Sequence, residues 1–273
     1  MSNFPLWTPT DAGQLIAVPL ADDDKYSRGV LGVITGSEQY PGAAVLGVEA
    51  ALRTGVGMVR YIGPQRAADL VLQRRPEAVA SNGRVQAWLM GSGMDHAAIA
   101  DAAGTSMAEA ISQGLPTILD GGAFELHTNV TGPTIITPHF RELARVLGVE
   151  VDTIASDPAA AAERAASQLG LTVLLKGHTT YVAAPDGTRL SARSAPSWLA
   201  TAGAGDALGG VLGALVATHS REIADDPGLL ARLGATASVI HGLAAERASR
   251  GGPLTILALT DEIPATVAAL VGQ

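Results

Sequence analysis

The stretch Val30-Leu31-Gly32-Val33-Ile34 is followed by the small-residue segment Gly42–Thr54 and then by Met58-Val59-Arg60-Tyr61-Ile62. Two short apolar, β-branched runs thus enclose a segment of helical length, which predicts a strand, a helix and a second strand. Repeated along a chain, this alternation is typical of a mostly parallel sheet that is covered by helices on both faces. The fold class predicted from this stretch is α/β.

The rest of the chain repeats the pattern and then departs from it. Further strands are predicted at Ala87–Met90, Thr117–Leu119, Thr134–Ile136 and Thr172–Leu175, and helices at 106–113, 139–147 and Pro158–Leu169. In the last third, the pattern predicts a hairpin (179–183 and 188–191) and helices at 206–219, Leu229–Ser249 and 261–271. No linker or repeat divides the chain, so we expect one domain over residues 1–273, with residues 1–24 as a lead-in arm or a first helix.

Composition excludes several classes of protein. The 273 residues are 47% hydrophobic and 16% charged and contain no Cys, which excludes a long disordered chain and a disulfide scaffold. The formal charge of -8 and the lack of a Lys/Arg cluster argue against nucleic acid as a partner. The opening residues do not resemble a secretion signal, and the longest apolar run, 207–217, is shorter than the roughly 20 residues that a bilayer requires. We therefore expect a cytoplasmic protein without a membrane partner.

The first candidate site is the loop Thr201-Ala202-Gly203-Ala204-Gly205-Asp206, which leads into an apolar helix. In open α/β sheets, ligands bind outside the carboxyl ends of the strands. Glycines let the backbone approach a ligand, and the free N–H groups at a helix start attract an anion such as phosphate. Asp206 can accept a proton from a substrate hydroxyl there. As plain structure it is a helix N-cap, and the hexapeptide alone leaves these two interpretations evenly balanced.

A second loop, Lys176-Gly177-His178-Thr179-Thr180, follows the predicted strand Thr172–Leu175. It combines a cation, a close-approach glycine and two hydroxyls, which suits the phosphates of a nucleotide. The alternative is a solvated lysine that opens the hairpin. The loop lies 25 residues before Thr201, where the glycine-aspartate loop begins, and this position favours the binding role.

Three further loops carry weaker signals. In Thr137-Pro138-His139, Thr137 can cap a helix with Pro138 at its first position, which places the His139 ring near a strand end; a plain helix start is the favoured interpretation of this loop alone. Small residues in 35–44 and 91–95 leave room for a bulky ligand.

The other histidines lack metal-ligand spacing and are expected to be core or surface residues: His96, His127, His219 and His241. Neither a Gly-x-Ser-x-Gly elbow nor a P-loop is present, which excludes those two enzyme classes.

Taken together and in this order, the motifs resemble the ribokinase-like superfamily and, within it, the ADP-dependent NAD(P)H-hydrate dehydratase family. The resemblance rests on Gly36-Ser37, 40–46, 50–59, Thr137-Pro138-His139 with Glu142, 174–177 and 200–206. The chain departs from the family pattern at Asp120-Gly121-Gly122-Ala123, where the family shows Asp-Ala-Asp-Ala, and at Gly91-Ser92-Gly93-Met94-Asp95, where it shows Gly-Pro-Gly-Leu-Gly.

The resemblance implies a ribokinase-like three-layer αβα sandwich and a set of site residues. By the same resemblance, the adenine nucleotide contacts Lys176, Gly177, His178, Thr179, Thr180 and Gly205, and the hydrated dinucleotide faces Ala43, Gly93, His139 and Asp206. The resemblance also implies ADP as co-substrate, Mg²⁺, a homotetramer, and an NAD(P)H-hydrate epimerase that is a separate protein. The apolar face of residues 229–245 could serve such an assembly, although a core role is the favoured interpretation.

The implied reaction returns the S-epimer of hydrated NADH or NADPH to NAD(P)H, with AMP and phosphate as the other products. Asp206 would take the proton of the ring hydroxyl, the nucleotide would phosphorylate that oxygen, and phosphate would then leave. The first alternative is an ATP-dependent small-molecule kinase for a vitamin precursor, built on the same Asp206. The second is a nucleotide-binding sensor without catalysis.

Overall fold

The computed structural model describes residues 3–95, 102–193 and 195–272. Within these residues, one eight-stranded sheet forms the centre, in the order β2-β1-β3-β4-β5-β6-β7-β8. Its strands are β1 (Val30–Ile34), β2 (Met58–Tyr61), β3 (Ala87–Met90), β4 (Thr117–Leu119), β5 (Thr134–Ile136), β6 (Thr172–Leu175), β7 (Thr180–Ala183) and β8 (Arg189–Ala192). Strands β1 to β6 are parallel, whereas β7 and β8 form an antiparallel hairpin. The mostly parallel sheet and the hairpin are thus confirmed, with strand ends within one residue of the prediction.

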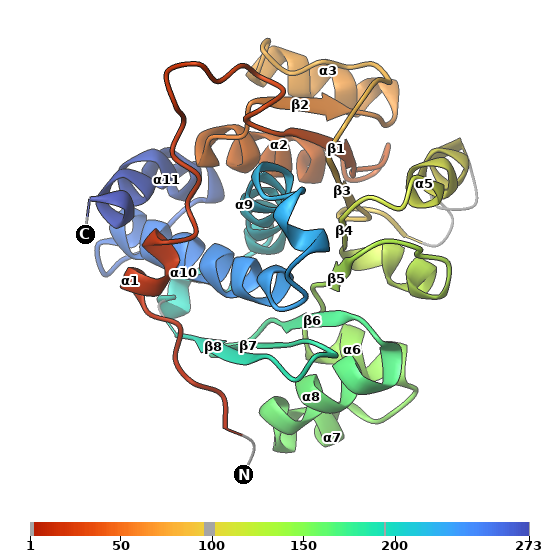
Figure 1. Ribbon diagram of the computed structural model, residues 1–273, viewed down its shortest axis with the longest axis vertical. Coiled ribbons are helices and arrows are strands. Elements are labelled where there is room, and N and C mark those ends of the chain that lie inside the picture. The colour runs from red at the N-terminus through yellow and green to blue at the C-terminus, as the bar shows by residue number, and fades with distance from the viewer. Residues whose placement is uncertain (1–2, 96–101, 194, 273) are drawn as a thin grey trace.

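Helices cover both faces of the sheet, as Figure 1 shows. One face carries α2 (Gly42–Thr54), α9 (Ala204–Thr218), α10 (Leu229–Ser249) and α11 (Ile256–Val271), with α3 (Gln65–Arg74) packed beside α2. The other face carries α5 (Ala102–Ser112), α6 (Phe140–Leu147), α7 (Val151–Ser156) and α8 (Pro158–Leu169). The remaining short elements are α1 (Pro9–Gly13), η1 (Gly121–Thr128), η2 (Ser197–Leu199) and η3 (Glu222–Ala224). The three-layer αβα arrangement is confirmed.

Two apolar cores lie between these layers. Leu31 and Val33 of β1 point into the core shared with α2, α9 and α10, whereas Val30 and Ile34 point into the core on the opposite face. Successive strand residues alternate between faces, and both faces are covered, so the whole strand is apolar. The apolar residues of α10 are also buried, which confirms their core role. Among the described helices, none combines the length and the hydropathy needed to cross a bilayer.

Several helix starts differ from the prediction. Helix α11 begins at Ile256 instead of residue 261, because the Thr255 hydroxyl accepts a hydrogen bond from the Ala258 N–H at 3.3 Å and caps it. Helix α9 begins at Ala204 instead of Asp206, after Gly203 in the left-handed region (φ 91°). Asp206 therefore is not the N-cap, and its side chain is not committed to closing the helix. Helices α3 and α7 were not predicted.

Helices α2 and α9 cross in close contact. A Cβ placed on Gly210 of α9 would lie 2.2 Å from the backbone oxygen of Gly47 on α2, so only glycine fits at this position. The crossing fixes the first turn of α9 relative to the first turn of α2. The two helices, which begin at Gly42 and Ala204, therefore pack against each other directly after their first turns.

A buried carboxylate joins three helices on this face. Glu49 of α2 is fully buried and forms ion pairs with Arg53 at 2.6 Å, with Arg74 at 3.1 Å and with Arg75. Arg53 also contacts Asp261 of α11 at 2.6 Å. Burial by itself raises the pKa of Glu49, but hydrogen bonds from Arg75, Arg53 and Arg74 outweigh it and lower the pKa to about 2. Arg53, which lies in the segment 50–59 of the family resemblance, thus has a structural role.

This pKa shift predicts a component of acid sensitivity. Because the pKa of Glu49 is lower in the folded chain than in the unfolded one, its stabilisation is fully present above the unfolded value and is lost as pH falls from about 4.5 to about 2. Urea midpoints measured across this range should fall more steeply for the wild type than for Glu49→Gln, which lacks the titrating group. Parallel pH curves for the two proteins would contradict the assignment.

The lead-in segment contains an arm followed by a short helix. Residues 5–7 pair with β8: the Trp7 N–H donates to the Ser191 oxygen at 2.8 Å, and the Ser191 N–H donates to the Pro5 oxygen at 2.9 Å. The Trp7 indole donates to the Thr236 hydroxyl of α10 at 3.0 Å. Helix α1 then begins with a capping box between Thr8 and Asp11. The edge of the sheet at β8 is therefore covered.

Candidate active site

The strand order reverses at β1, because β2 lies on one side of it and β3 on the other. At such a point, the loops that follow the two strands diverge and leave a crevice for a ligand. Here the Gly36 N–H donates to the Ser92 oxygen at 2.7 Å, which joins the loops after β1 and β3. Gly93 adopts φ 66°, and a Cβ on it would lie 2.4 Å from the Cβ of Ala43. The predicted substrate residues Ala43 and Gly93 are therefore in contact beside the reversal point.

Four neighbouring strands place polar side chains together at their carboxyl ends. Asp120, after β4, accepts hydrogen bonds from the Ser92 hydroxyl at 2.6 Å and from the Thr137 hydroxyl at 2.7 Å. Lys176, after β6, donates to the same carboxylate at 2.8 Å. Asp120 is 5% exposed, so this network is a buried ion pair with its remaining lone pairs satisfied. Asp120 thereby fixes the position of the Lys176 ammonium.

The pair remains charged despite its burial. Burial alone raises the pKa of Asp120, but the charge of Lys176 and the hydrogen bonds outweigh it and lower that pKa. In the same way, burial lowers the pKa of Lys176, but Asp120 and Glu142 outweigh it and raise that pKa. The lysine is therefore a permanent cation at the strand ends, which suits a phosphate ligand.

Asp206 lies in the first turn of α9 and faces this cluster. Burial raises the pKa of Asp206, and so does the nearby charge of Asp120, whereas the Ser92 hydroxyl and Lys176 oppose the rise. A Cβ on Gly205 would lie 3.3 Å from the Lys176 Nζ, which places the helix start directly beside the lysine. Asp206 is partly exposed, so a ligand can reach its carboxylate. A carboxylate with raised proton affinity beside an anion site is suited to general-base chemistry.

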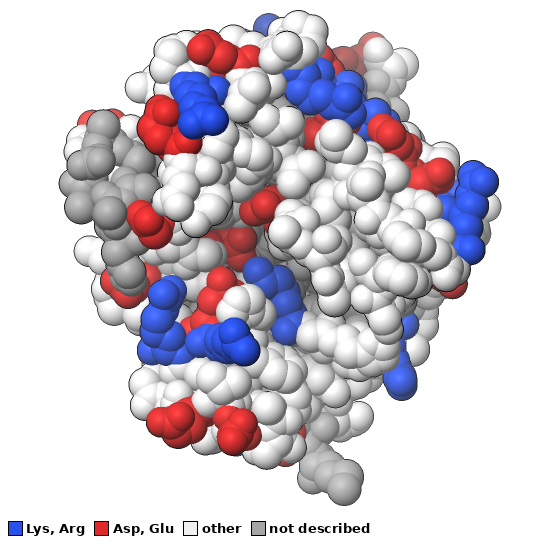
Figure 2. Space-filling model, turned by 180° about the vertical axis from the view of Figure 1, so that it is seen from behind, with Lys and Arg blue, Asp and Glu red and all other residues white. Residues whose placement is uncertain are grey.

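Figure 2 shows one face of the molecule hollowed near its centre, with acidic and basic side chains gathered around the hollow. Glu142 adds a further carboxylate to the cluster, with its Oε2 at 3.9 Å from the Lys176 Nζ.

Among the described residues, no three His, Cys, Asp or Glu side chains are close enough to form a metal site by themselves. Mg²⁺ is commonly held by one or two carboxylates together with substrate phosphates, and Asp206 and Glu142 are partly exposed carboxylates that fit this arrangement.

The start of α6 corrects one prediction. Thr137 does not cap this helix, because its hydroxyl is bonded to Asp120. His139 is the N-cap instead: its Nδ1 accepts from the Glu142 N–H at 3.2 Å, and the Glu142 carboxylate accepts from the His139 N–H at 2.8 Å. Pro138 lies outside the helix, where its oxygen accepts from the Lys176 N–H at 2.8 Å. The His139 side chain is 53% exposed at the strand ends, so it is available to a ligand.

The predicted nucleotide loop lies beside the lysine. Gly177 and His178 are exposed, and Thr179 and Thr180 lead into β7, where Thr180 pairs with Ala192 of β8. The structure thus brings Lys176 and Gly205 together directly, while the rest of the loop extends along the neighbouring hairpin.

Several residues of the site were missed or given no role by sequence reasoning. Ser92 and Asp120 lie in the two loops that depart from the family pattern, yet Asp120 is the acceptor that holds the cluster together.

His241 was expected in the core or on the surface, and it is buried in the core beside Ala204. Burial lowers the pKa of His241 to about 4. The hydrogen bond to the Ala204 backbone acts in the opposite direction but is outweighed, so the ring is neutral. His127 bonds to the Phe124 oxygen, and His96 lies outside the described residues.

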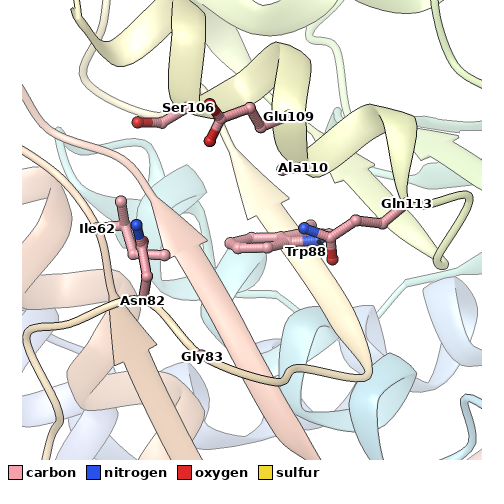
Figure 3. A pocket seen from close by; sticks show the side chains of 8 residues that line it. All are labelled: Ile62, Asn82, Gly83, Trp88, Ser106, Glu109, Ala110 and Gln113. Atoms are coloured by element: carbon pink, nitrogen blue, oxygen red, sulfur yellow. Dashed lines mark hydrogen bonds between the residues drawn. The ribbon is translucent and has the colours of Figure 1, made fainter.

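A separate cavity of about 210 Å³ lies between the sheet and α5 (Figure 3). The Trp88 indole of β3 forms one wall, and its Nε1 donates to the Gln113 Oε1 at 3.3 Å. The cavity lies on the face of the sheet opposite to α9, and no predicted site residue lines it. The polar cluster around Asp206 and Lys176 therefore remains the candidate active site.

Known proteins share both the sequence and the fold. A family profile described as NAD(P)H-hydrate dehydratase matches residues 31–264. The chain is 36% identical to a bifunctional NAD(P)H-hydrate repair enzyme of Corynebacterium glutamicum, over 92% of this chain and 49% of that protein. It is 34% identical to an ADP-dependent (S)-NAD(P)H-hydrate dehydratase of Neisseria meningitidis, over 72% of each chain. The chain thus spans about half the length of the bifunctional relatives that it matches.

A crystal structure of the ADP/ATP-dependent NAD(P)H-hydrate dehydratase of Bacillus subtilis, co-crystallised with ATP/Mg²⁺, superposes with a TM-score of 0.87. The match covers 99% of this chain and 100% of that one at 26% identity. A ribokinase-like superfamily protein of Enterococcus faecalis, 20% identical in sequence, superposes with a TM-score of 0.84. The match covers 99% of this chain and 97% of that one, and this likeness confirms the predicted ribokinase-like fold. Since the family profile covers most of the chain, this protein belongs to the NAD(P)H-hydrate dehydratase family.

Proposed function

We propose that this chain catalyses the ADP-dependent dehydration of the S-epimer of hydrated NADH or NADPH and releases NAD(P)H, AMP and phosphate. One observation carries the proposal: a partly exposed carboxylate of raised pKa, Asp206, faces a fixed ammonium, Lys176, at a helix start beside the strand-order reversal. The names of the Neisseria and Bacillus relatives support this choice of reaction and nucleotide.

In the proposed reaction, Asp206 accepts the proton of the ring hydroxyl while that oxygen bonds to the β-phosphorus of ADP. The bond between this phosphorus and the bridging oxygen breaks, and AMP leaves. Lys176 and the N–H groups around Gly205 stabilise the charge on the transferred group. The ring nitrogen then donates its electron pair, the carbon–oxygen bond breaks to release phosphate, and the adjacent ring carbon loses a proton. This step restores the dihydronicotinamide.

The other predicted residues take binding roles in this proposal. Lys176, Gly177, His178, Thr179, Thr180 and Gly205 hold ADP, and Ala43, Gly93 and His139 face the hydrated dinucleotide. Mg²⁺, held by the nucleotide phosphates with Glu142, would neutralise charge on the phosphates. We further propose that residues 1–273 form one dehydratase domain of a cytoplasmic homotetramer, and that an epimerase supplies the S-epimer. Light scattering coupled to size exclusion would measure the oligomeric state.

The test incubates the protein with hydrated NADH, Mg²⁺ and either ADP or ATP. We expect the absorbance of reduced nicotinamide to return, with one AMP and one phosphate formed per NADH when ADP is used. If absorbance fails to return with either nucleotide, the proposed function is wrong. A stable phosphorylated alcohol formed from a vitamin precursor would instead identify a small-molecule kinase.

Asp120→Asn tests the role of the buried pair. The substitution keeps the size of the side chain but removes the charge that fixes Lys176, so the ammonium should leave its position beside Gly205. We expect kcat/KM to fall about 100-fold, the cost of misplacing a positioning contact. Steady-state kinetics would measure this, with Asp186→Asn in the exposed hairpin turn as the control. Equal kinetics for the Asp120 variant and the wild type would contradict the positioning role.

A further inference from the structure

One large aromatic side chain is exposed on the segment that connects β8 to α9. Trp198 of η2 is 51% exposed. The other two tryptophans pack inside: Trp88 is 4% exposed, and the partly buried Trp7 is bonded through its indole to Thr236. An exposed indole offers a broad apolar face that a planar ligand can cover.

The chain places Trp198 between the two segments proposed to bind the nucleotide. Residue Ala192, at the end of β8, lies directly opposite Thr180 of the lysine loop. From there the chain runs through η2 to Gly203, where the turn of Gly205 begins beside Lys176. Trp198 thus lies on the connection whose two ends are both at the phosphate-binding residues.

The indole is hydrogen-bonded to the turn that ends α10. Its Nε1 donates to the Gly251 oxygen at 3.3 Å. Arg250 has φ 47° and Gly251 has φ 87°, and Arg250 is the only residue other than glycine with positive φ in the described ranges 3–95, 102–193 and 195–272. Arg250 is the C-cap of α10, so these left-handed residues form the turn that ends the helix. The loop after α10 also continues to Ile256, which approaches Gly203, so it contacts the connection both at Trp198 and at Gly203.

We propose that Trp198 stacks on the adenine ring of the nucleotide and so determines its affinity. This inference rests on the proposed function, because it assumes that an adenine nucleotide binds at Lys176 and Gly205. An ammonium group and the N–H groups of a helix start attract phosphate, and neither distinguishes ADP from a nucleotide with a smaller base. A fixed indole adds a contact that depends on the base and grows with its aromatic area.

Calorimetry of ADP binding to the wild type, Trp198→Ala and Trp198→Phe tests the proposal. Loss of one base-stacking contact should weaken ADP binding about tenfold in Trp198→Ala, while Trp198→Phe, which keeps an aromatic ring, should stay within about threefold of the wild type. Inorganic pyrophosphate, which has no base, should bind all three proteins equally. Tyr26→Ala is the matched control, because Tyr26 is an exposed aromatic residue on the lead-in segment, 41% exposed, and should leave ADP binding unchanged.

Fluorescence gives a second readout that needs no loss of binding. ADP should quench the emission of the wild type, pyrophosphate should not, and the quenching should disappear in Trp198→Phe. Equal ADP affinity in Trp198→Ala and the wild type would overturn the inference and leave the proposed function intact. Equal weakening for ADP and pyrophosphate would also overturn it, because the loop rather than the ring would then be responsible. Failure of the wild type to bind ADP would overturn both.

Discussion

Asp206→Asn is expected to lower kcat for the return of NADH by about 10²–10⁴-fold, the usual contribution of a general base. Asparagine has the same size and leaves the N–H groups around Gly205 and the Lys176 ammonium in place, so the dissociation constant for ADP should change less than about threefold. Steady-state kinetics and calorimetry on the same preparation would separate the two effects. Asp152→Asn, at an exposed position in the first turn of α7, is the control.

The pH profile adds a second check on the same residue. Burial and the charge of Asp120 raise the pKa of Asp206 above its ordinary value, so its basic form is lost at a higher pH than that of an exposed aspartate. The rate in the wild type should therefore fall on the acid side with an apparent pKa above 3.8. Unchanged activity in Asp206→Asn would reject this carboxylate as the base.

Glu49→Ala is expected to lower the free energy of unfolding by about 3–5 kcal/mol, because removal of one partner from a buried ion pair leaves the other charges uncompensated. Here three guanidinium groups, from Arg53, Arg74 and Arg75, would lose their shared acceptor. Urea unfolding of the variant would measure the loss. Glu246→Gln, on an exposed position of α10, should change the same quantity by less than about 0.5 kcal/mol. A loss below about 1 kcal/mol in Glu49→Ala would show that the cluster contributes little to stability.

The pattern of apolar runs predicted the strands well, because each buried strand is a short continuous signal in the chain. The position of Lys176 at a strand end and those of Gly205 and Asp206 at a helix start could also be predicted, since each follows from the local pattern. What could not be predicted depends on strand order. The four strands β3 to β6 are adjacent, and only this order brings Ser92, Asp120 and Lys176 into one hydrogen-bonded network.

The same limit explains the errors at helix starts. Thr137 is a good capping residue by type, but Asp120, 17 residues earlier in the chain, competes for its hydroxyl, and His139 takes over the cap. Glu49 gave no signal because its partners Arg74 and Arg75 are on a helix 25 residues further along, which the apolar pattern did not mark. Local patterns predict elements, whereas contacts between distant segments decide what a polar side chain does.

The pairing of residues 5–7 with β8 has a consequence for how this fold joins other modules. An open strand edge recruits strands from other molecules, and here the chain's own beginning occupies that edge. A neighbouring module fused ahead of residue 3 would enter beside β8, at the opposite side of the sheet from β2. Such a fusion must keep residues 5–7 free to pair, because an unpaired β8 would leave an open strand edge.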